Sequence, residues 1–153
     1  MSLHTASLSW RRGDAVFADG KYPRAHTVSF DGGASLTGSA APDVVRPPLS
    51  DPAGVDPEEL LVASAAMCHM LFFLDFARKA GFVVDSYDDA PAGTLGRDGA
   101  GVVRITGITL YPRIAFSGEV VPGAADIAAL HHKAHEACFI ARTLNCPVTV
   151  EPA

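Results

Sequence analysis

The chain has 153 residues, of which 48% are hydrophobic and 19% are charged, and its formal net charge is −5 at pH 7. This length suits one domain with a real core, and the composition excludes a disordered chain. The negative charge and the absence of a Lys/Arg cluster exclude nucleic acid and anionic membrane as expected partners.

The first twelve residues lack a basic start followed by an apolar run, so no signal peptide is predicted. The longest uncharged run, Leu60–Leu74, is shorter than the roughly 20 residues of a membrane span. We therefore expect a soluble cytoplasmic protein without a membrane partner. Thiols stay reduced in that compartment, so a disulfide among the three cysteines is expected to be transient and catalytic.

The N-terminal third has the pattern of a β-meander. Leu3–Trp10 and Arg24–Phe30 alternate at period two and predict strands, and a turn at 31–33 leads to a third strand, Ala34–Thr37. Gly38–Val55 is rich in Pro, Ser, Ala and Asp, which predicts a loop. Loops of this length in a compact domain are often functional.

A helix start follows this loop. Asp56 is a capping residue, Pro57 takes the first helical position, and Glu59 closes a capping box. The helix is predicted to continue over Leu60–Ala80 and to stop at Gly81. Its middle is apolar on all sides, which predicts a buried helix rather than a surface one.

The second half predicts two long strands, Phe82–Leu95 and Val102–Phe116, joined by a turn at 96–99. A second helix is expected over Ala124–Leu144, and a last strand over Cys146–Val150. This order predicts one α+β domain over residues 1–153. A dimer that wraps a second copy around the apolar first helix would bury it.

Cys68 and Cys138 are predicted to lie in the middle of the two helices, on or beside their apolar faces. Most buried cysteines are small core residues, and that interpretation stays open for both. Two such helices allow a facing pair of thiols, but sequence spacing does not show that the sulfurs meet.

A reactive thiolate needs a nearby cation, because the pKa of a free thiol lies near 8.5. Arg24 follows Pro23 at the start of a predicted strand and is the candidate. Glu58 lies nearly three helical turns before Cys68, too far for direct contact within the helix, but it can clamp an arginine from elsewhere. The alternative for Glu58 is an acid that stabilises the helix N-terminus.

Two stretches carry a family resemblance. Asp56-Pro57-Glu58-Glu59-Leu60-Leu61 followed by Ala65-Ala66-Met67-Cys68 resembles the first signature of the OsmC/Ohr family, and Cys138 stands where that family has its second cysteine. The resemblance covers essentially the whole chain. It implies an OsmC-like fold, with antiparallel sheets around a long buried helix, in an intertwined homodimer with two active sites at the subunit interface.

The resemblance also implies a thiol peroxidase that reduces organic hydroperoxides and has hydrogen peroxide as a second candidate substrate. Cys68 would attack the peroxide, Cys138 would resolve the sulfenic acid as a disulfide, and Glu58 would orient Arg24 against the thiolate. Arg11, Arg12 and Arg46 remain alternatives for that arginine. The family's chemistry needs no cofactor, and a small-molecule or protein dithiol would be the reductant.

Three positions depart from the family's common form. Phe139-Ile140-Ala141 follows Cys138, His69 follows Cys68 where Phe is usual, and Cys146 is a third thiol. These departures indicate a divergent branch. Cys146 is interpreted as structural, with a role as an alternative resolving thiol left open.

Two other functions compete with the peroxidase. The first is a non-catalytic OsmC-like stress protein whose cavity binds an apolar ligand. The second is a metal-binding protein, because His131, His135 and Cys138 share one helix face at spacings that zinc or copper accepts. Surface histidines also produce such runs by chance, and one helix supplies only three ligands.

Overall fold

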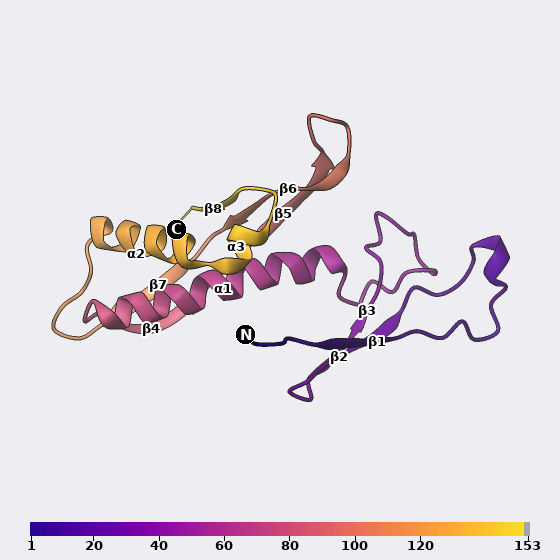
Figure 1. Cartoon of the computed structure of the whole chain (residues 1–153), viewed down its shortest axis with the longest axis horizontal. Helices are drawn as coiled ribbons and strands as arrows, with labels where there is room; N and C mark the ends of the chain where they lie inside the picture. The colour runs from indigo at the N-terminus through magenta and orange to yellow at the C-terminus, as the bar shows by residue number, and fades with distance from the viewer. Residues whose placement is uncertain (152–153) are drawn as a thin grey trace. The chain divides into compact units, whose positions relative to one another are not determined.

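A computed structural model describes residues 1–151, and its internal contacts divide the chain into two units, Met1–Leu60 and Leu61–Ala153. We call them the N-terminal and the C-terminal unit. The boundary lies inside the long helix α1 (Pro57–Lys79), drawn in magenta in Figure 1. The single domain expected over residues 1–153 stays a prediction, and its last two residues lie outside the described part.

The N-terminal unit contains the predicted meander. Strands β1 (Ala6–Ser9), β2 (His26–Phe30) and β3 (Ser35–Gly38) form an antiparallel sheet in that order (Figure 1). The long β1–β2 connection contains the short 3₁₀ helix η1 (Phe17–Asp19). Trp10, Phe17 and Tyr22 pack ring against ring there, with centroids 4.6 to 6.1 Å apart, so aromatic contacts hold this connection together.

The predicted loop between β3 and α1 is confirmed. Its end returns to the sheet, because Val55 forms a parallel bridge with Gly38 and its amide donates to the Thr37 carbonyl at 2.9 Å. Asp56 follows directly and caps α1. The return of the loop therefore sets where the helix begins.

The predicted capping box is present at the start of α1. The Glu59 amide donates to Asp56 Oδ1 at 2.7 Å, and the Asp56 amide donates to Glu59 Oε2 at 3.0 Å. At the other end Gly81 has a φ of +85°, a left-handed conformation that glycine adopts without strain. Both predicted ends of the helix are thus explained by single residues.

Replacing the capping residue tests this account. Asp56→Ala removes the carboxylate that accepts from the Glu59 amide, so we expect it to lower the free energy of unfolding by about 1 kcal/mol. Urea titrations followed by circular dichroism measure the difference. Asp14→Ala, at an exposed position away from the helix, is the matched control and should leave stability unchanged. Equal stability of both variants would contradict the role of the cap.

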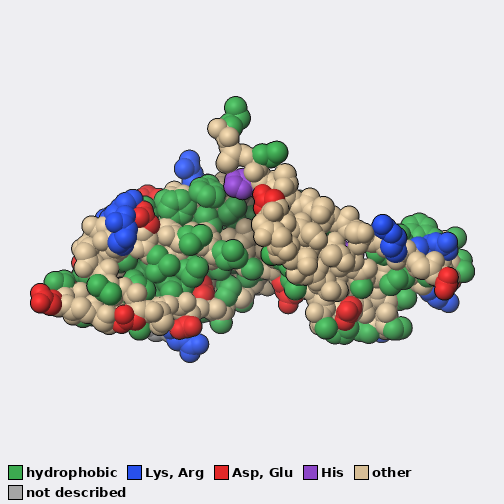
Figure 2. Space-filling model, turned by 90° about the horizontal axis from the view of Figure 1, so that it is seen from below, with side chains coloured by type: hydrophobic (Ala, Val, Ile, Leu, Met, Phe, Trp, Pro, Cys, Tyr) green, Lys and Arg blue, Asp and Glu red, His purple; other side chains and the backbone are tan. Residues whose placement is uncertain are grey.

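The prediction that α1 is buried on all sides is wrong for the single chain. Ala65, Cys68, His69 and Phe73 are among its buried residues, but Met67 and Leu71 are 59% and 60% exposed. Figure 2 shows hydrophobic side chains gathered over the left part of one face. By length and hydropathy α1 could cross a membrane, a test that core helices of soluble proteins also pass.

The two predicted long strands are four shorter ones. Strand β4 (Val83–Asp88) pairs antiparallel with β7 (Arg113–Ser117), and β5 (Ala92–Arg97) pairs antiparallel with β6 (Val103–Leu110). Pro91 and Pro112 lie at the two breaks. Proline lacks an amide to donate to a ladder, which explains why both strands are interrupted.

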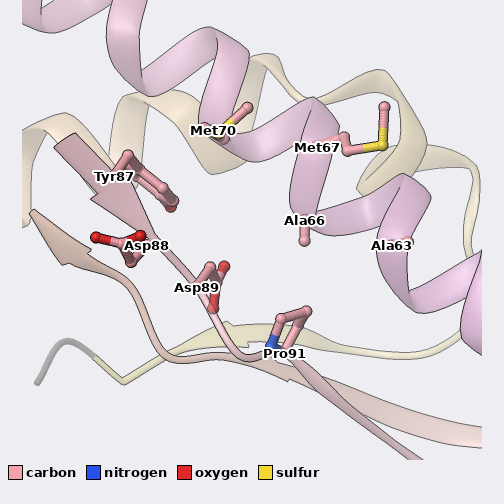
Figure 3. Close-up of a pocket in the computed structure, with 8 residues that line it drawn as sticks. All are labelled: Ala63, Ala66, Met67, Met70, Tyr87, Asp88, Asp89 and Pro91. Carbon is pink, nitrogen blue, oxygen red and sulfur yellow. The ribbon is translucent and has the colours of Figure 1, made fainter.

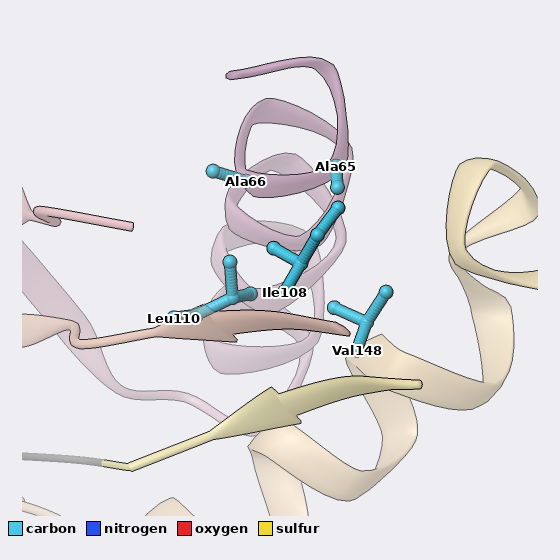
Figure 4. Packing of buried hydrophobic residues seen from close by; sticks show 5 residues of the cluster. All are labelled: Ala65, Ala66, Ile108, Leu110 and Val148. Carbon is cyan, nitrogen blue, oxygen red and sulfur yellow. The ribbon is translucent and has the colours of Figure 1, made fainter. Parts of the chain in front are cut away.

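The last strand, β8 (Val148–Val150), pairs in parallel with β6 and completes the sheet β5-β6-β8. Residues from this sheet and from α1 form a core cluster, which Figure 4 shows: Ala65, Ala66, Ile108, Leu110 and Val148. Small alanines on α1 let the helix lie close to the larger side chains of β6. The Cys68 segment of α1 therefore rests on a packed sheet.

The second predicted helix is also divided. Helix α2 (Ala124–Ala137) ends at Cys138, and a short helix α3 (Phe139–Thr143) follows. Cys138 has an extended backbone, with φ −67° and ψ 101°, and its sulfur accepts from the Ala141 amide at 3.4 Å as the cap of α3. Cys138 is thus at a helix junction and not in the middle of one helix.

Candidate functional site

The structure brings Cys68 and Cys138 together within the C-terminal unit. Both thiols are reduced and buried, with exposed fractions of 8% and 0%. Cys68 lies close enough to Cys138 to be among the groups that raise the pKa of the Cys138 thiol. The contact that the spacing of the two cysteines could not establish is therefore present.

Burial is the largest cause that raises the pKa of Cys138 to about 11, and the neighbouring Cys68 acts in the same direction. The thiol of Cys138 is accordingly protonated at neutral pH. A protonated thiol beside a second sulfur suits a residue that waits to condense with an oxidised partner, rather than one that attacks first.

Arg24 lies in the N-terminal unit, two residues before β2. Its guanidinium donates to the carbonyl oxygens of Gly20 and Tyr22 and lies 3.7 Å from the centroid of the Tyr22 ring. Arg11 and Arg12 similarly donate to carbonyl oxygens close in sequence. These contacts hold Arg24 in the aromatic connection between β1 and β2.

Glu58 lies in the first turn of α1, where its negative charge stabilises the N-terminal end of the helix dipole. Within residues 1–151 no ion pair joins Glu58 to Arg24. Both residues belong to the N-terminal unit, and Cys68 belongs to the C-terminal unit. The roles of Arg24 and Glu58 at the thiol therefore stay predictions.

His69, which directly follows Cys68, and His131, seven residues before Cys138, form a buried pair that the sequence patterns did not predict. His69 Nε2 and His131 Nδ1 are 3.0 Å apart, and the rings stack at an interplanar angle of 14°. The two residues are only 1% and 5% exposed. Burial lowers the pKa of each imidazole to about 4, so both are neutral at pH 7.

One signal in the sequence could have revealed this pair. His69 stands alone in the apolar middle of the first helix, and His131 stands on the apolar stripe of the second. A buried polar side chain needs a partner, so two lone polar residues on two facing apolar stripes are expected to pair.

The proposed trio of metal ligands does not form. Across residues 1–151 no three His, Cys, Asp or Glu side chains are arranged to hold a metal ion. His131 pairs with His69, and the Cys138 sulfur accepts from a backbone amide. The interpretation of His131, His135 and Cys138 as a metal site is therefore not supported.

A pocket of about 390 Å³ is lined by α1, by the end of β4 and by the segment that follows β4 (Figure 3). Met67 and Met70 of α1 line it together with Tyr87, Asp89 and Pro91. Tyr87 Oη and Asp89 Oδ2 are themselves buried and have no hydrogen-bond partner within residues 1–151, and burial together with the Asp89 charge raises the pKa of Tyr87. This pocket offers a mostly apolar space, and one of the residues that line it, Met67, directly precedes Cys68.

Comparison with known proteins identifies the fold. The family model for OsmC-like proteins matches residues 50–153. A structure of an OsmC-like protein of unknown function from Vibrio cholerae is 44% identical, covers 100% of both chains and has a TM-score of 0.97. A search of curated proteins found no match. The chain belongs to the OsmC-like family, and the expected α+β OsmC-like fold is confirmed.

More distant structures share the fold. An organic hydroperoxide resistance protein OsmC from Legionella pneumophila is 16% identical, with coverage of 99% and 96% and a TM-score of 0.69. The organic hydroperoxide resistance protein OhrB from Bacillus subtilis is 22% identical, with coverage of 97% and 98% and a TM-score of 0.65. At these identities the two structures show a shared fold.

Proposed function

We propose that the protein is a cytoplasmic thiol peroxidase that reduces organic hydroperoxides. The observation that carries this proposal is that two free, buried cysteines lie close together, Cys68 within α1 and Cys138 at the junction of α2 and α3. Two such thiols can pass between a dithiol and a disulfide without moving through solvent. No cofactor is required for this chemistry.

In the proposed cycle the Cys68 thiolate attacks one oxygen of the hydroperoxide and breaks the O–O bond. The sulfur becomes a sulfenic acid and the alcohol leaves after it takes up a proton. The Cys138 thiol then condenses with the sulfenic acid, which forms the disulfide and releases water. An external dithiol reduces the disulfide and is itself oxidised to its disulfide.

Arg24 and Glu58 are proposed to support the first step. A guanidinium near the sulfur stabilises the thiolate and polarises the O–O bond, and Glu58 would orient that guanidinium. In this proposal Arg24 leaves the carbonyl oxygens that it binds in the single chain. Formation of a homodimer would cause this movement of Arg24. The exposed Met67 and Leu71 on α1 offer an apolar surface to which a second subunit can bind.

A second function is favoured by the pocket in Figure 3. Met67 and Met70 line a space large enough for a small apolar molecule. A non-catalytic member of the family would use this pocket for ligand binding, with the two thiols kept only as core residues.

Peroxide-dependent thiol loss separates the two functions. Reduced protein is mixed with one equivalent of cumene hydroperoxide, and intact mass and free thiols are followed over seconds. We expect loss of two thiols and of the mass of two hydrogen atoms, which is restored by a dithiol. Cys146→Ser should behave in the same way. Retention of all thiols for minutes would overturn the peroxidase and favour the ligand-binding function.

A further inference from the structure

The hydrogen bond between His69 and His131 connects α1 to α2. Among the described residues it is the only side-chain hydrogen bond between nitrogen or oxygen atoms that joins these helices. Phe73 packs beside it, with its ring centroid 4.5 Å from that of His131. The pair thus forms a polar contact inside an otherwise apolar helix–helix interface.

The pair shares one proton at its centre. With both imidazoles neutral, one ring presents its N–H at this contact and the other ring presents its unprotonated nitrogen; either ring can take either role. The outer nitrogens, His69 Nδ1 and His131 Nε2, are buried and have no partner among the described residues. Two apolar side chains would fill this space without leaving unpartnered atoms, so the pair is not explained by packing alone.

A hydrogen bond restricts how two helices can slide along each other more strongly than apolar packing does. Apolar contacts tolerate a small slide of one helix along another, whereas a nitrogen–nitrogen bond at 3.0 Å defines a single axial register. Buried polar pairs that fix register are known from helical interfaces. A one-residue slide of an α-helix is about 1.5 Å.

The same register places the two sulfurs. Cys68 and His69 are consecutive on α1, while His131, Ala134 and Cys138 follow one another along one stripe of α2 up to its end. Ala134 is fully buried between them and allows close approach. A disulfide needs its two Cα atoms within about 4.4–6.8 Å of each other. A slide of one residue, about 1.5 Å, is more than half the width of that range.

We propose that His69 and His131 are positioning residues that hold α1 and α2 in the register in which Cys138 reaches oxidised Cys68. This inference rests on the proposed peroxidase function for its kinetic consequence. It concerns the formation of the disulfide and not the attack on the peroxide. The histidines touch neither substrate nor reacting atoms and act through the helices that carry the cysteines.

The kinetic test separates the two steps. After one equivalent of cumene hydroperoxide, a sulfenic-acid trap reports the attack by Cys68, and non-reducing intact mass reports the disulfide. We expect His69→Phe to leave the attack within about twofold of wild type and to slow disulfide formation at least about tenfold. Disulfide formation at the wild-type rate, or equal slowing of both steps, would overturn the inference.

Rescue and control variants exclude a merely structural effect. His69→Gln keeps a polar atom at the position of Nε2, so disulfide formation should return to within about threefold of wild type. His132→Gln alters a side chain of α2 that is 72% exposed and should change neither step. Failure of the Gln variant to rescue would overturn the role of the hydrogen bond.

An equilibrium measurement keeps the inference testable if peroxide does not react or if His69→Phe does not fold. The double variant His69→Phe/His131→Leu leaves no unpartnered nitrogen, and its Cys68–Cys138 equilibrium can be measured in dithiothreitol buffers. We expect the disulfide to be about tenfold less stable than in wild type, a potential about 30 mV higher. An unchanged potential would overturn the inference even where peroxidase activity is present, and a shifted potential would support it even where that activity is absent.

Discussion

Cys68→Ser should reduce peroxide-driven thiol oxidation by on the order of 10³-fold or more, to the background rate of the remaining thiols. A hydroxyl stays protonated at neutral pH and is a poor nucleophile toward the O–O bond. Cys68 is the candidate for attack because its partner Cys138 is fully buried and has a pKa raised to about 11. Stopped-flow consumption of cumene hydroperoxide measures the rate.

Cys138→Ser is the matched variant for this result. It should leave one rapid turnover and stop at a sulfenic acid on Cys68, because no nearby thiol condenses with it. Cys146→Ser, at a cysteine outside the Cys68–Cys138 pair, should turn over as wild type does. Rapid turnover by Cys68→Ser would contradict the assignment of the attacking sulfur, and a disulfide in Cys138→Ser would assign resolution to Cys146.

The parts of the fold that the sequence predicted well depend on local chemistry. Asp56, Glu59 and Gly81 define the ends of α1 through hydrogen bonds and backbone conformation within a few residues. The meander was predictable for the same reason, since alternation and a glycine turn act locally. Family resemblance supplied the arrangement of these elements, which local patterns do not contain.

The errors arose where distant residues decide the structure. Pro91 and Pro112 looked tolerable within long apolar runs, yet each interrupts the same antiparallel ribbon, and Asp89 Oδ1 accepts the Tyr111 amide across the break. The end of α2 at Cys138 has no proline or glycine to signal it. There the sulfur satisfies the Ala141 amide, a contact that no sequence pattern predicts.

In the candidate site, too, local features could be predicted from the sequence and contacts between distant residues could not. The two cysteines could be predicted by residue type and family motif, and their contact needed the packing of α1 against α2. The exposed side of α1 around Met67 and Leu71 shows why burial was overestimated, because an apolar sequence does not say which chain covers it. The histidine pair needed both helices and their register at once.

The second large effect is on stability in acid. The pKa of His69 is lowered to about 4 by burial and then by the neighbouring His131 and His135, and burial lowers that of His131 to about 4. An unfolded histidine titrates near 6.5. Between these values the unfolded chain binds more protons than the folded one, so the contribution is fully present above pH 6.5 and is lost as pH falls toward 4.

Protonation of only one of the two imidazoles lowers the free energy of unfolding by on the order of 3 kcal/mol between pH 6.5 and pH 4. Urea titrations at pH 7.5, 6.5, 5.5 and 4.5 measure it, at one protein concentration because subunit association would add to stability. The double variant His69→Phe/His131→Leu should give a much flatter profile, and His132→Gln should follow wild type.

Other groups change stability outside this range. Lys79 and Arg78 lower the pKa of Asp75 below its usual value of 3.8, so its contribution is lost only at lower pH. Within the range itself, His135 is the further histidine near the pair, and it helps to lower the pKa of His69. Parallel profiles for wild type and the double variant would therefore show that the buried imidazoles are not the groups that titrate. A steeper wild-type profile would connect the stability of the fold to the same bond that is proposed to align the two sulfurs.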